Sequence, residues 1–212
     1  MPDTIDTAVL TDWVHRFRDA VTDKREWLTE LDSAIGDADH GANMARGMTA
    51  AVAKIDAGSA STCDELLKSV GMTLVSSVGG ASGPLYGTFF LRMGMTAGAA
   101  AELDGAGLAS ALRAGLDGIV ARGKAEAGDK TLFDAMAPAV DAFDAALGDG
   151  GDLAEAALSA ADAAESGRDA TAPLVARKGR ASYLGERSAG HLDPGAASTA
   201  LLFRALADAI AG

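Results

Sequence analysis

Apolar residues recur every three or four positions along most of this chain, and this spacing constrains the fold more than any other feature. The runs include Leu10, Trp13, Val14, Phe17 and Val21; Met44, Met48, Val52 and Ile55; Leu66, Leu67, Val70, Leu74 and Val78; Leu108, Leu112, Leu116, Ile119 and Val120; and Leu201, Leu202, Leu206 and Ile210. Side chains with this spacing share one face of a helix. The chain is also rich in Ala, Leu and Gly and poor in aromatic and β-branched residues, which favours helices over sheets.

Short links rich in Gly and Asp separate the expected helices, and no segment has a convincing strand pattern. Segment 148–152 is the clearest of these links, and the helix that follows it is expected to resume around Leu174 and Val175. The sequence therefore predicts an all-α fold, a barrel or bundle of about eight antiparallel amphipathic helices. We expect it to form one domain that spans residues 1–212.

The charge and the cysteine content exclude several classes of protein. A formal net charge of −12 argues against nucleic acid or an anionic membrane as partner, since both reward clustered Lys and Arg. The single cysteine, Cys63, allows no intramolecular disulfide. Residues 1–6 lack the basic and apolar regions of a signal peptide, and no apolar stretch predicts a membrane span. We therefore expect a cytoplasmic protein.

Segment 31–43 concentrates three carboxylates, those of Asp32, Asp37 and Asp39, with no Lys or Arg among them. On a helix Asp37 and Asp39 would point in different directions, whereas an irregular loop lets both side chains turn to one point. Asp32, at the expected end of the preceding helix, can face the same point. Three converging carboxylates would repel one another in a partly dry site. A hard cation such as Mg²⁺, bound together with phosphate oxygens, would relieve that repulsion.

Two other interpretations of this segment compete with a Mg²⁺ site. Asp and Gly are ordinary turn residues, so a solvated surface turn remains an alternative. An EF-hand loop would need a glycine at its sixth position and a glutamate at its twelfth. Counted from Asp37, those positions hold Ala42 and Met48, which excludes the EF-hand.

Two further segments have the composition of phosphate sites. Segment 78–87 is rich in glycine and places Ser82 where a helix should begin, and helix N-termini attract anions. It is not a Walker A loop, and an ordinary glycine turn with a helix cap explains it equally well. Segment 177–188 holds the densest positive charge, with Lys178 and Arg180 as candidates for pairing with phosphate. Together the segments indicate a Mg²⁺-nucleotide or Mg²⁺-phosphate site.

In order and spacing, segments 36–43, 79–87, 128–131, 179–188 and 191–195 resemble the nucleotide-binding L subunit of bacterial dihydroxyacetone kinase. The resemblance runs from the first helix to the last. It implies a barrel of eight antiparallel helices that binds adenine nucleotide in the loops at one end. It also implies that Asp32, Asp37 and Asp39 hold two Mg²⁺ ions, and that Arg180 is the candidate catalytic residue that meets phosphate charge.

The resemblance further implies a set of residues around ADP or ATP. They are His40, Gly41, Ala42, Asn43, Ala81, Ser82, Gly123, Leu132, Arg180, Asp193, Pro194 and Gly195. Two positions depart from the family pattern. Ala38 stands where the family commonly has glycine, so a positive φ there would be less comfortable, and Ala81 replaces a threonine of some relatives.

In this family the carbonyl substrate is held by a separate K subunit, and the L subunit carries the nucleotide. The resemblance therefore implies a K subunit as partner. In the phosphotransferase-linked version, a phosphohistidine carrier of the phosphoenolpyruvate system is a second partner and rephosphorylates bound ADP. The alternatives are a subunit of an ATP-exchanging kinase, for dihydroxyacetone or a four-carbon sugar, and a non-catalytic nucleotide-sensing module. A plain helical metal-binding protein is disfavoured by the expected anion loops at Ser82 and Gly195.

Overall fold

The computed structural model describes residues 4–212, so residues 1–3, on which part of the signal-peptide argument rests, lie outside it. Its elements are β1 (Thr4–Asp6), α1 (Thr7–Asp23), α2 (Arg25–Ile35), α3 (His40–Asp56), α4 (Cys63–Ser77), α5 (Ser82–Ala97), β2 (Glu102–Asp104), α6 (Gly105–Gly123), α7 (Phe133–Gly148), α8 (Leu153–Ala170), a 3₁₀ segment η1 (Arg180–Ser188) and α9 (Pro194–Ala211). The all-α prediction is confirmed.

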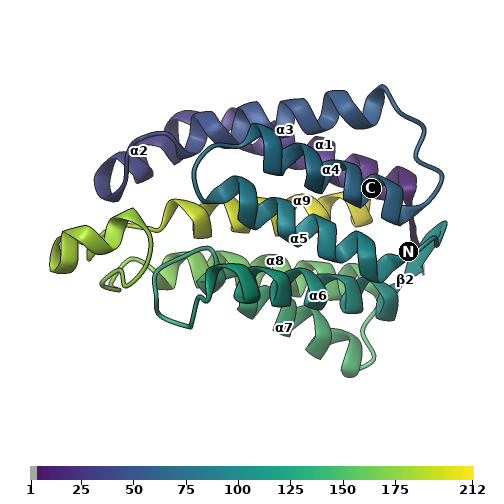
Figure 1. The fold of residues 1–212 in the computed structure, drawn as a ribbon. Coiled ribbons are helices and arrows are strands. Elements are labelled where there is room, and N and C mark those ends of the chain that lie inside the picture. Colours follow the sequence, from purple (N-terminus) through teal and green to yellow (C-terminus); the bar gives the residue numbers. More distant parts are fainter. Residues whose placement is uncertain (1–3) are drawn as a thin grey trace.

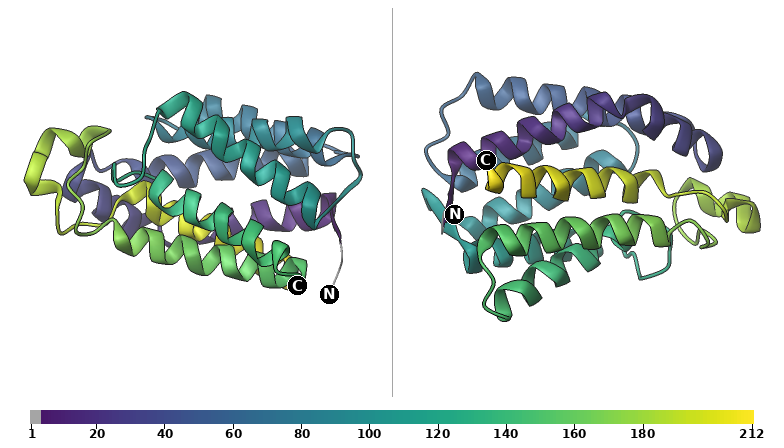
Figure 2. Two further views of the ribbon diagram at one scale, coloured as in Figure 1. Left: turned by 90° about the horizontal axis from the view of Figure 1, so that it is seen from below. Right: turned by 180° about the vertical axis from the view of Figure 1, so that it is seen from behind.

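Eight of the helices form a closed ring. Along the chain α3 to α9 each pack against the next, and α1 completes the ring between α9 and α3 (Figures 1 and 2). Neighbours in this ring run antiparallel, while α2 extends beyond α1 and packs on α3. Inside the ring, Trp13 of α1 packs against Phe90 of α5, and its indole N–H donates to the Leu202 carbonyl of α9 at 2.9 Å. The apolar residues of the runs seen in the sequence therefore pack into or against one core, except Val120, which is exposed.

Two short strands correct the expectation of a strand-free chain. Strands β1 and β2 pair antiparallel, with Ile5 opposite Leu103 and both side chains buried. Each strand has only three residues, too few for the alternating pattern that identifies a strand in a sequence. The strands end at Asp6 and Asp104, whose carboxylates cap the first turns of α1 and α6.

The expected resumption of the α8 helix around Leu174 and Val175 is wrong. The helix ends at Ala170, and the chain runs without regular structure through Leu174 and Val175. Pro173 explains the stop, because proline lacks an N–H and disfavours helical backbone at the residue before it. The start of α8 lies directly after the 148–152 link, as expected, and Asp152 and Glu155 form a reciprocal capping box there.

The irregular segments divide between the two ends of the barrel. At the left-hand end of Figure 1 lie the α2–α3 loop, the α4–α5 loop, the α6–α7 loop and the long α8–α9 connection with η1. The two strands and the α7–α8 turn lie at the other end. None of the helices in residues 4–212 combines the length and apolar character that crossing a membrane requires.

Candidate functional site

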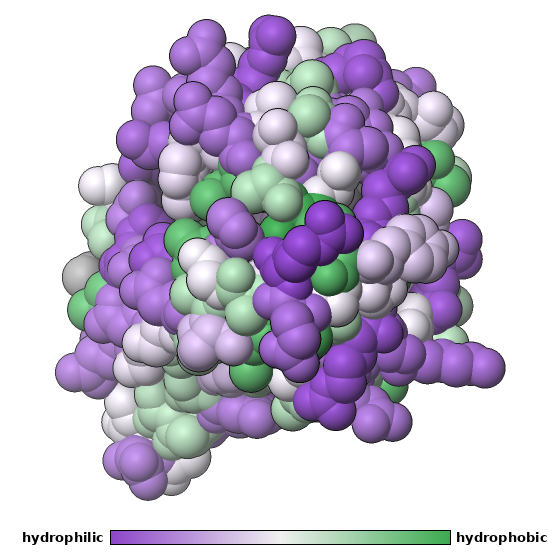
Figure 3. All heavy atoms as spheres, turned by 90° about the vertical axis from the view of Figure 1, so that its left-hand side faces the viewer, coloured by the Kyte–Doolittle hydropathy of each residue, from purple (hydrophilic) through white to green (hydrophobic). Residues whose placement is uncertain are grey.

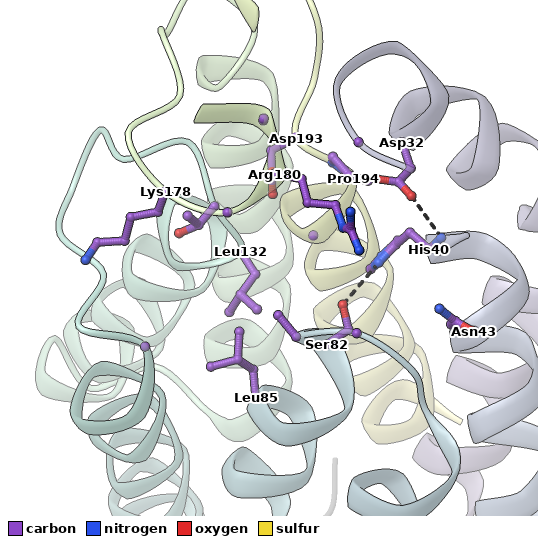
Figure 4. A pocket seen from close by; sticks show the side chains of 18 of the residues that line it. Asp32, His40, Asn43, Ser82, Leu85, Leu132, Lys178, Arg180, Asp193 and Pro194 are labelled. Carbon is purple, nitrogen blue, oxygen red and sulfur yellow. Dashed lines mark hydrogen bonds between the residues drawn. The ribbon is translucent and has the colours of Figure 1, made fainter. Parts of the chain in front are cut away.

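The four loops at one end of the barrel enclose a cavity of about 520 Å³. Figure 3 looks onto this end and shows hydrophobic side chains in a hollow with a mostly hydrophilic surround. The cavity brings together residues from all the segments that the sequence singled out, although they are up to about 160 positions apart. Its walls differ in chemistry, with carboxylates on one side and apolar side chains on another (Figure 4).

The three carboxylates of the α2–α3 loop do converge. Asp32, Asp37 and Asp39 each offer an oxygen within 4.8 Å of the other two. Asp32 is buried, and its Oδ2 accepts from the backbone N–H groups of Asp39 and His40 at 2.8 and 3.1 Å, which folds the loop around it. Gly36 makes room for this arrangement, since a Cβ there would lie 2.0 Å from Asp32 Oδ1.

This donor set fits a divalent cation. Carboxylate oxygens at such separations suit Mg²⁺, and one buried carboxylate held by backbone N–H groups gives the loop a fixed shape before any ion arrives. Ala38, between the other two carboxylates, has φ of 62°. This is the positive φ at which the sequence analysis expects alanine to be less comfortable than glycine, because left-handed backbone disfavours a Cβ.

Arg180 faces the acidic loop from the opposite rim of the cavity. Its Nε lies 2.9 Å from Asp37 Oδ2, although two thirds of its side chain is exposed (68%). It projects into the space between the loops in Figure 4. The sequence predicted that Arg180 would meet phosphate, and in this structure its contact is the carboxylate beside that position. An exposed ion pair of this kind contributes little to stability. Breaking it, so that Arg180 can contact another anion, would therefore cost little free energy.

The α4–α5 loop forms a second wall. Gly80 has φ of 66°, and Gly79 lies against Asn43, so that a Cβ there would be 3.0 Å from the amide nitrogen. Ser82 begins α5, where the first N–H groups of a helix have no partner within it. Ala81 and Ser82 line the cavity, as does Asn43 of α3, so the structure brings these two segments together.

The apolar wall lies between α5, α6 and the α6–α7 loop. Leu85 and Leu132 face each other in Figure 4, and Ile119 and Gly123 complete this part of the lining. A Cβ at Gly195 would lie 3.2 Å from that of Leu132, so the small residue lets α9 begin close to this wall. A flat apolar slot beside carboxylates and helix N-termini can take an aromatic base attached to a phosphate chain.

Asp193 is buried beside this wall and caps α9 through a 2.7 Å bond from the Ala196 N–H. Burial raises the pKa of Asp193 to about 7, and only part of that effect is offset by backbone N–H groups and by Lys130. Burial therefore makes the carboxyl group of Asp193 easier to protonate than that of an exposed aspartate. It forms part of the cavity lining together with Pro194 and Gly195, as the sequence predicted.

Lys130 anchors the α8–α9 connection, a role that the sequence analysis missed. Its side chain is 1% exposed, and Nζ donates to the carbonyls of Thr171, Ala172, Leu174 and His191 at 2.5 to 3.3 Å. Burial lowers the pKa of Lys130, and the carboxyl of Asp193 opposes that shift. The contacts leave only a weak signal in the sequence, because the four carbonyls lie 41 to 61 positions further along the chain.

His40 is a buried residue of the cavity lining. Its Nε2 is 2.9 Å from Ser198 Oγ of α9, and its Nδ1 is 3.2 Å from Ser82 Oγ (the latter drawn in Figure 4). Desolvation lowers the pKa of His40, while Asp32 and Asp39 act in the other direction. The sequence analysis did not single out Ser198 or Tyr86, whose hydroxyl groups are hydrogen-bonded to each other. Both lie on helix faces whose composition indicates only a buried core.

Two of the predicted nucleotide contacts are not on the lining. Gly41 and Ala42 follow His40 in the first turn of α3. Gly41 faces α2, where a Cβ would lie 2.1 Å from the Arg25 carbonyl, so its glycine serves the close contact of two helices. The other ten predicted contacts and all three carboxylates line the cavity.

The DAK2 domain family matches this chain over residues 34–208, which is most of its length. The chain belongs to the DAK2 domain family. The match includes two of the three carboxylates, all of the predicted nucleotide contacts and the helices from α3 to α9. The resemblance expected from the sequence is thereby confirmed.

Relatives of this DAK2 protein include ADP-binding subunits. It is 46% identical to the PEP-dependent dihydroxyacetone kinase, ADP-binding subunit DhaL, of Escherichia coli K12, with 93% of this chain and 94% of that protein covered. It is 43% identical to the PTS-dependent dihydroxyacetone kinase, ADP-binding subunit DhaL, of Lactococcus lactis. That match covers 98% of this chain and 99% of that protein.

A solved structure shares the fold. The dihydroxyacetone kinase from C. freundii, in complex with AMP-PNP and Mg²⁺, superposes with a TM-score of 0.73 at 27% identity. The match covers 96% of this chain and 34% of that one, so this chain spans about a third of the solved kinase. The barrel is therefore shared with one part of that kinase chain.

Proposed function

We propose that this chain is the ADP-binding subunit of a dihydroxyacetone kinase. In this proposal it passes a phosphoryl group from a phosphohistidine carrier of the phosphoenolpyruvate system, through Mg²⁺-bound nucleotide, to dihydroxyacetone held on a separate K subunit. The convergence of three carboxylates at the mouth of the cavity carries the proposal. It is supported by relatives of nearly equal length that are named ADP-binding subunits of PEP- or PTS-dependent dihydroxyacetone kinases.

In the proposed complex, Asp32, Asp37 and Asp39 hold two Mg²⁺ ions. Bound Mg²⁺ would neutralise phosphate charge and align the transferred group. The chain's own residues supply the rest of the site. Backbone N–H groups at the start of α5 meet phosphate oxygens, and the slot between Leu85 and Leu132 takes the adenine. Arg180, which pairs with Asp37 in this structure, would be free to meet phosphate charge if a cation were bound by the carboxylates.

In this proposal the acceptor comes from another chain, as the resemblance implies. The cavity opens at the end of the barrel, where a partner can reach it. A K subunit that covers the opening would exclude water from the transfer step. We place this reaction in the cytoplasm, as the sequence led us to expect.

A reconstitution assay tests the proposal. Formation of dihydroxyacetone phosphate is measured with this chain alone, with a K subunit and ATP, and with a K subunit and the full phosphoenolpyruvate relay. We expect activity with the relay and none with the chain alone. Activity with the K subunit and ATP alone would favour the ATP-exchanging kinase, and a parallel assay with a four-carbon ketose identifies the acceptor. Turnover by the isolated chain would contradict the subunit role.

A further inference from the structure

Three cations lie within four positions of the α8–α9 connection, and the structure gives them different partners. Arg180 Nε contacts Asp37 Oδ2 at 2.9 Å, across the cavity. Arg177 Nε lies 3.6 Å from Asp129 Oδ1, and Lys178 Nζ lies 3.9 Å from Asp129 Oδ2. Because both Lys178 and Arg180 line the cavity, some feature of the fold must decide which of them meets a bound anion.

The backbone between these two residues sends them in different directions. Gly179 has φ of 66° and ψ of −167°, a conformation that is nearly exclusive to glycine. Apart from its chain neighbours, no atom lies within 4 Å of the place that a Cβ would take, so the backbone angle and not close packing requires the glycine. Lys178 and Arg180 point to different sides in Figure 4. The turn at Gly179 therefore separates the two cations.

Asp129 of the α6–α7 loop supplies a second means of separation. Its side chain is 7% exposed, and Oδ2 accepts one backbone N–H, that of Glu126, at 2.9 Å. Among residues 4–212, the cations within 4.0 Å of this carboxylate are Arg177 and Lys178. A carboxylate that is shielded from water attracts a nearby cation more strongly than an exposed one does. Asp129 therefore draws both cations toward the α6–α7 loop.

The two cations beside Asp129 differ in how else they are held. The Arg177 backbone N–H donates to the Asp129 carbonyl at 3.1 Å, and its guanidinium donates to the Gly128 carbonyl at 3.0 and 3.3 Å. Arg177 is thus fixed on the loop backbone and is not part of the cavity lining. Lys178 does line the cavity, and within residues 4–212 its ammonium pairs with Asp129 alone. Lys178 is therefore the cation that could compete with Arg180 if the charge of Asp129 were lost.

We propose that Asp129 is a positioning residue, which holds Lys178 on the α6–α7 loop and thereby leaves Arg180 to meet phosphate beside the acidic loop. The Asp37 side chain is 37% exposed and releases Arg180 at little cost, whereas the buried Asp129 keeps its cation. Arginine offers phosphate two parallel N–H groups, which lysine cannot do, so the choice of cation sets how the phosphoryl group is oriented. The role toward phosphate rests on the proposed function, but the pairing of Lys178 with Asp129 does not.

Two matched variants of the α6–α7 loop test the positioning role. Asp129→Asn removes the charge that faces Lys178 and keeps an acceptor for the loop backbone. Asp134→Asn is the control, because Asp134 also accepts from two backbone N–H groups of this loop but pairs with no cation among residues 4–212. In the reconstituted relay we expect Asp129→Asn to lower kcat by at least roughly tenfold, since the phosphoryl group is held in the wrong geometry. Calorimetry should show Mg²⁺-ADP affinity no weaker than that of wild type, because the freed ammonium adds positive charge near the phosphates. Asp134→Asn should keep the wild-type kcat.

A second substitution separates competition from loss of structure. Asp129→Asn combined with Lys178→Met should recover most of the lost kcat, because the ammonium that the first change frees is then absent. A loop that had only lost its structure would not be rescued by removing a further side chain. Failure of this rescue, or a fall in Mg²⁺-ADP affinity together with kcat in Asp129→Asn, would overturn the proposal.

The pairing itself is measured in the ligand-free protein. The rate of lysine acetylation by an amine-reactive ester is followed by mass spectrometry, with the exposed Lys124 as the internal reference. We expect Lys178 to react faster in Asp129→Asn than in wild type or Asp134→Asn. Equal rates in the three proteins would overturn the proposal. If Lys178 reacted faster but wild type did not bind Mg²⁺-ADP, the proposed function would fail together with the role toward phosphate, and the pairing of Lys178 with Asp129 would stand.

Discussion

The two polar walls of the cavity compensate charge in opposite ways. In the α2–α3 loop three carboxylates converge, of which Asp32 alone is buried, and the exposed Arg180 pairs with one of them, Asp37. From the α6–α7 loop the buried ammonium of Lys130 donates to four backbone carbonyls of the α8–α9 connection. The carboxylates of the first wall outnumber the cations that pair with them. In the second wall the Lys130 ammonium is hydrogen-bonded to backbone carbonyls of the same chain.

The difference separates the acidic wall that we propose to bind the cation, called here the binding wall, from the supporting wall held by Lys130. Charge left uncompensated in a cavity is costly unless a ligand supplies the opposite charge, so the acidic loop is the part that gains most from a cation. Charge that is fully hydrogen-bonded instead fixes the backbone around it. The connection held by Lys130 carries Arg180 and Asp193, so the supporting wall sets where these two side chains can reach.

Removing the ammonium should give the largest effect on stability. Lys130→Met leaves four carbonyls, one buried and three part-buried, without their donor. We expect the free energy of unfolding to fall by about 3 kcal/mol. Urea unfolding followed by circular dichroism measures the change. Lys178→Met serves as the control, because Lys178 also lines the cavity but reaches only Asp129, at 3.9 Å. A Lys130→Met midpoint equal to that of the control would show that this wall does not depend on the ammonium.

The carboxyl of Asp193 should make the stability of this wall depend on pH. Its folded-state pKa is raised to about 7, above its unfolded value of 3.8, so the folded state binds the proton more tightly. Stability should therefore fall as pH rises between these values, by at most about 1.4 kcal/mol per pH unit for one proton. Asp193→Asn keeps a good helix cap and should flatten the profile.

Urea unfolding from acid to neutral pH provides that comparison. Asp152→Asn is the matched control, since Asp152 also caps a helix but is exposed at the other end of the barrel. We expect the control to keep the slope of the wild-type profile. An unchanged slope in Asp193→Asn would mean that the burial of Asp193 does not set the pH dependence.

A smaller effect should come from the backbone of the acidic loop. Ala38 has φ of 62°, and glycine would adopt this conformation without the Cβ penalty. Because glycine also adds freedom to the unfolded chain, we expect Ala38→Gly to stabilise by no more than about 1 kcal/mol. Ala57→Gly should destabilise instead, since Ala57 has φ of −80°. Equal changes in melting temperature for the two variants would show that the loop is not strained at Ala38.

The sequence predicted the binding wall better than the supporting wall. Asp32, Asp37 and Asp39 lie within eight positions of one another, so their convergence follows from local loop geometry. Ser82 and Pro194 were found because helix starts have their own composition. Features that depend only on residues close together in the chain can be predicted from a single sequence.

Contacts between distant segments could not be predicted in the same way. The carbonyls that accept from Lys130 carry no side-chain signature, and Ser198 lies 158 positions from His40. The pairing of Ile5 with Leu103 was missed for a similar reason, because it joins two strands nearly 100 positions apart. These features depend on the closure of the helix ring, which only the folded structure defines.

Calorimetric titration with ADP, in the presence and absence of Mg²⁺, tests the central claim most directly. The protein is first stripped of nucleotide and metal with a chelator. We expect wild type to bind ADP tightly only with Mg²⁺, and Asp37→Asn to lose at least roughly tenfold in affinity in the presence of Mg²⁺, because one charged ligand is removed. Asp149→Asn, a change of the same kind in the exposed turn between α7 and α8, should bind as wild type does. Equal Mg²⁺-ADP affinity for Asp37→Asn and wild type would contradict the assignment of the acidic loop as the cation site.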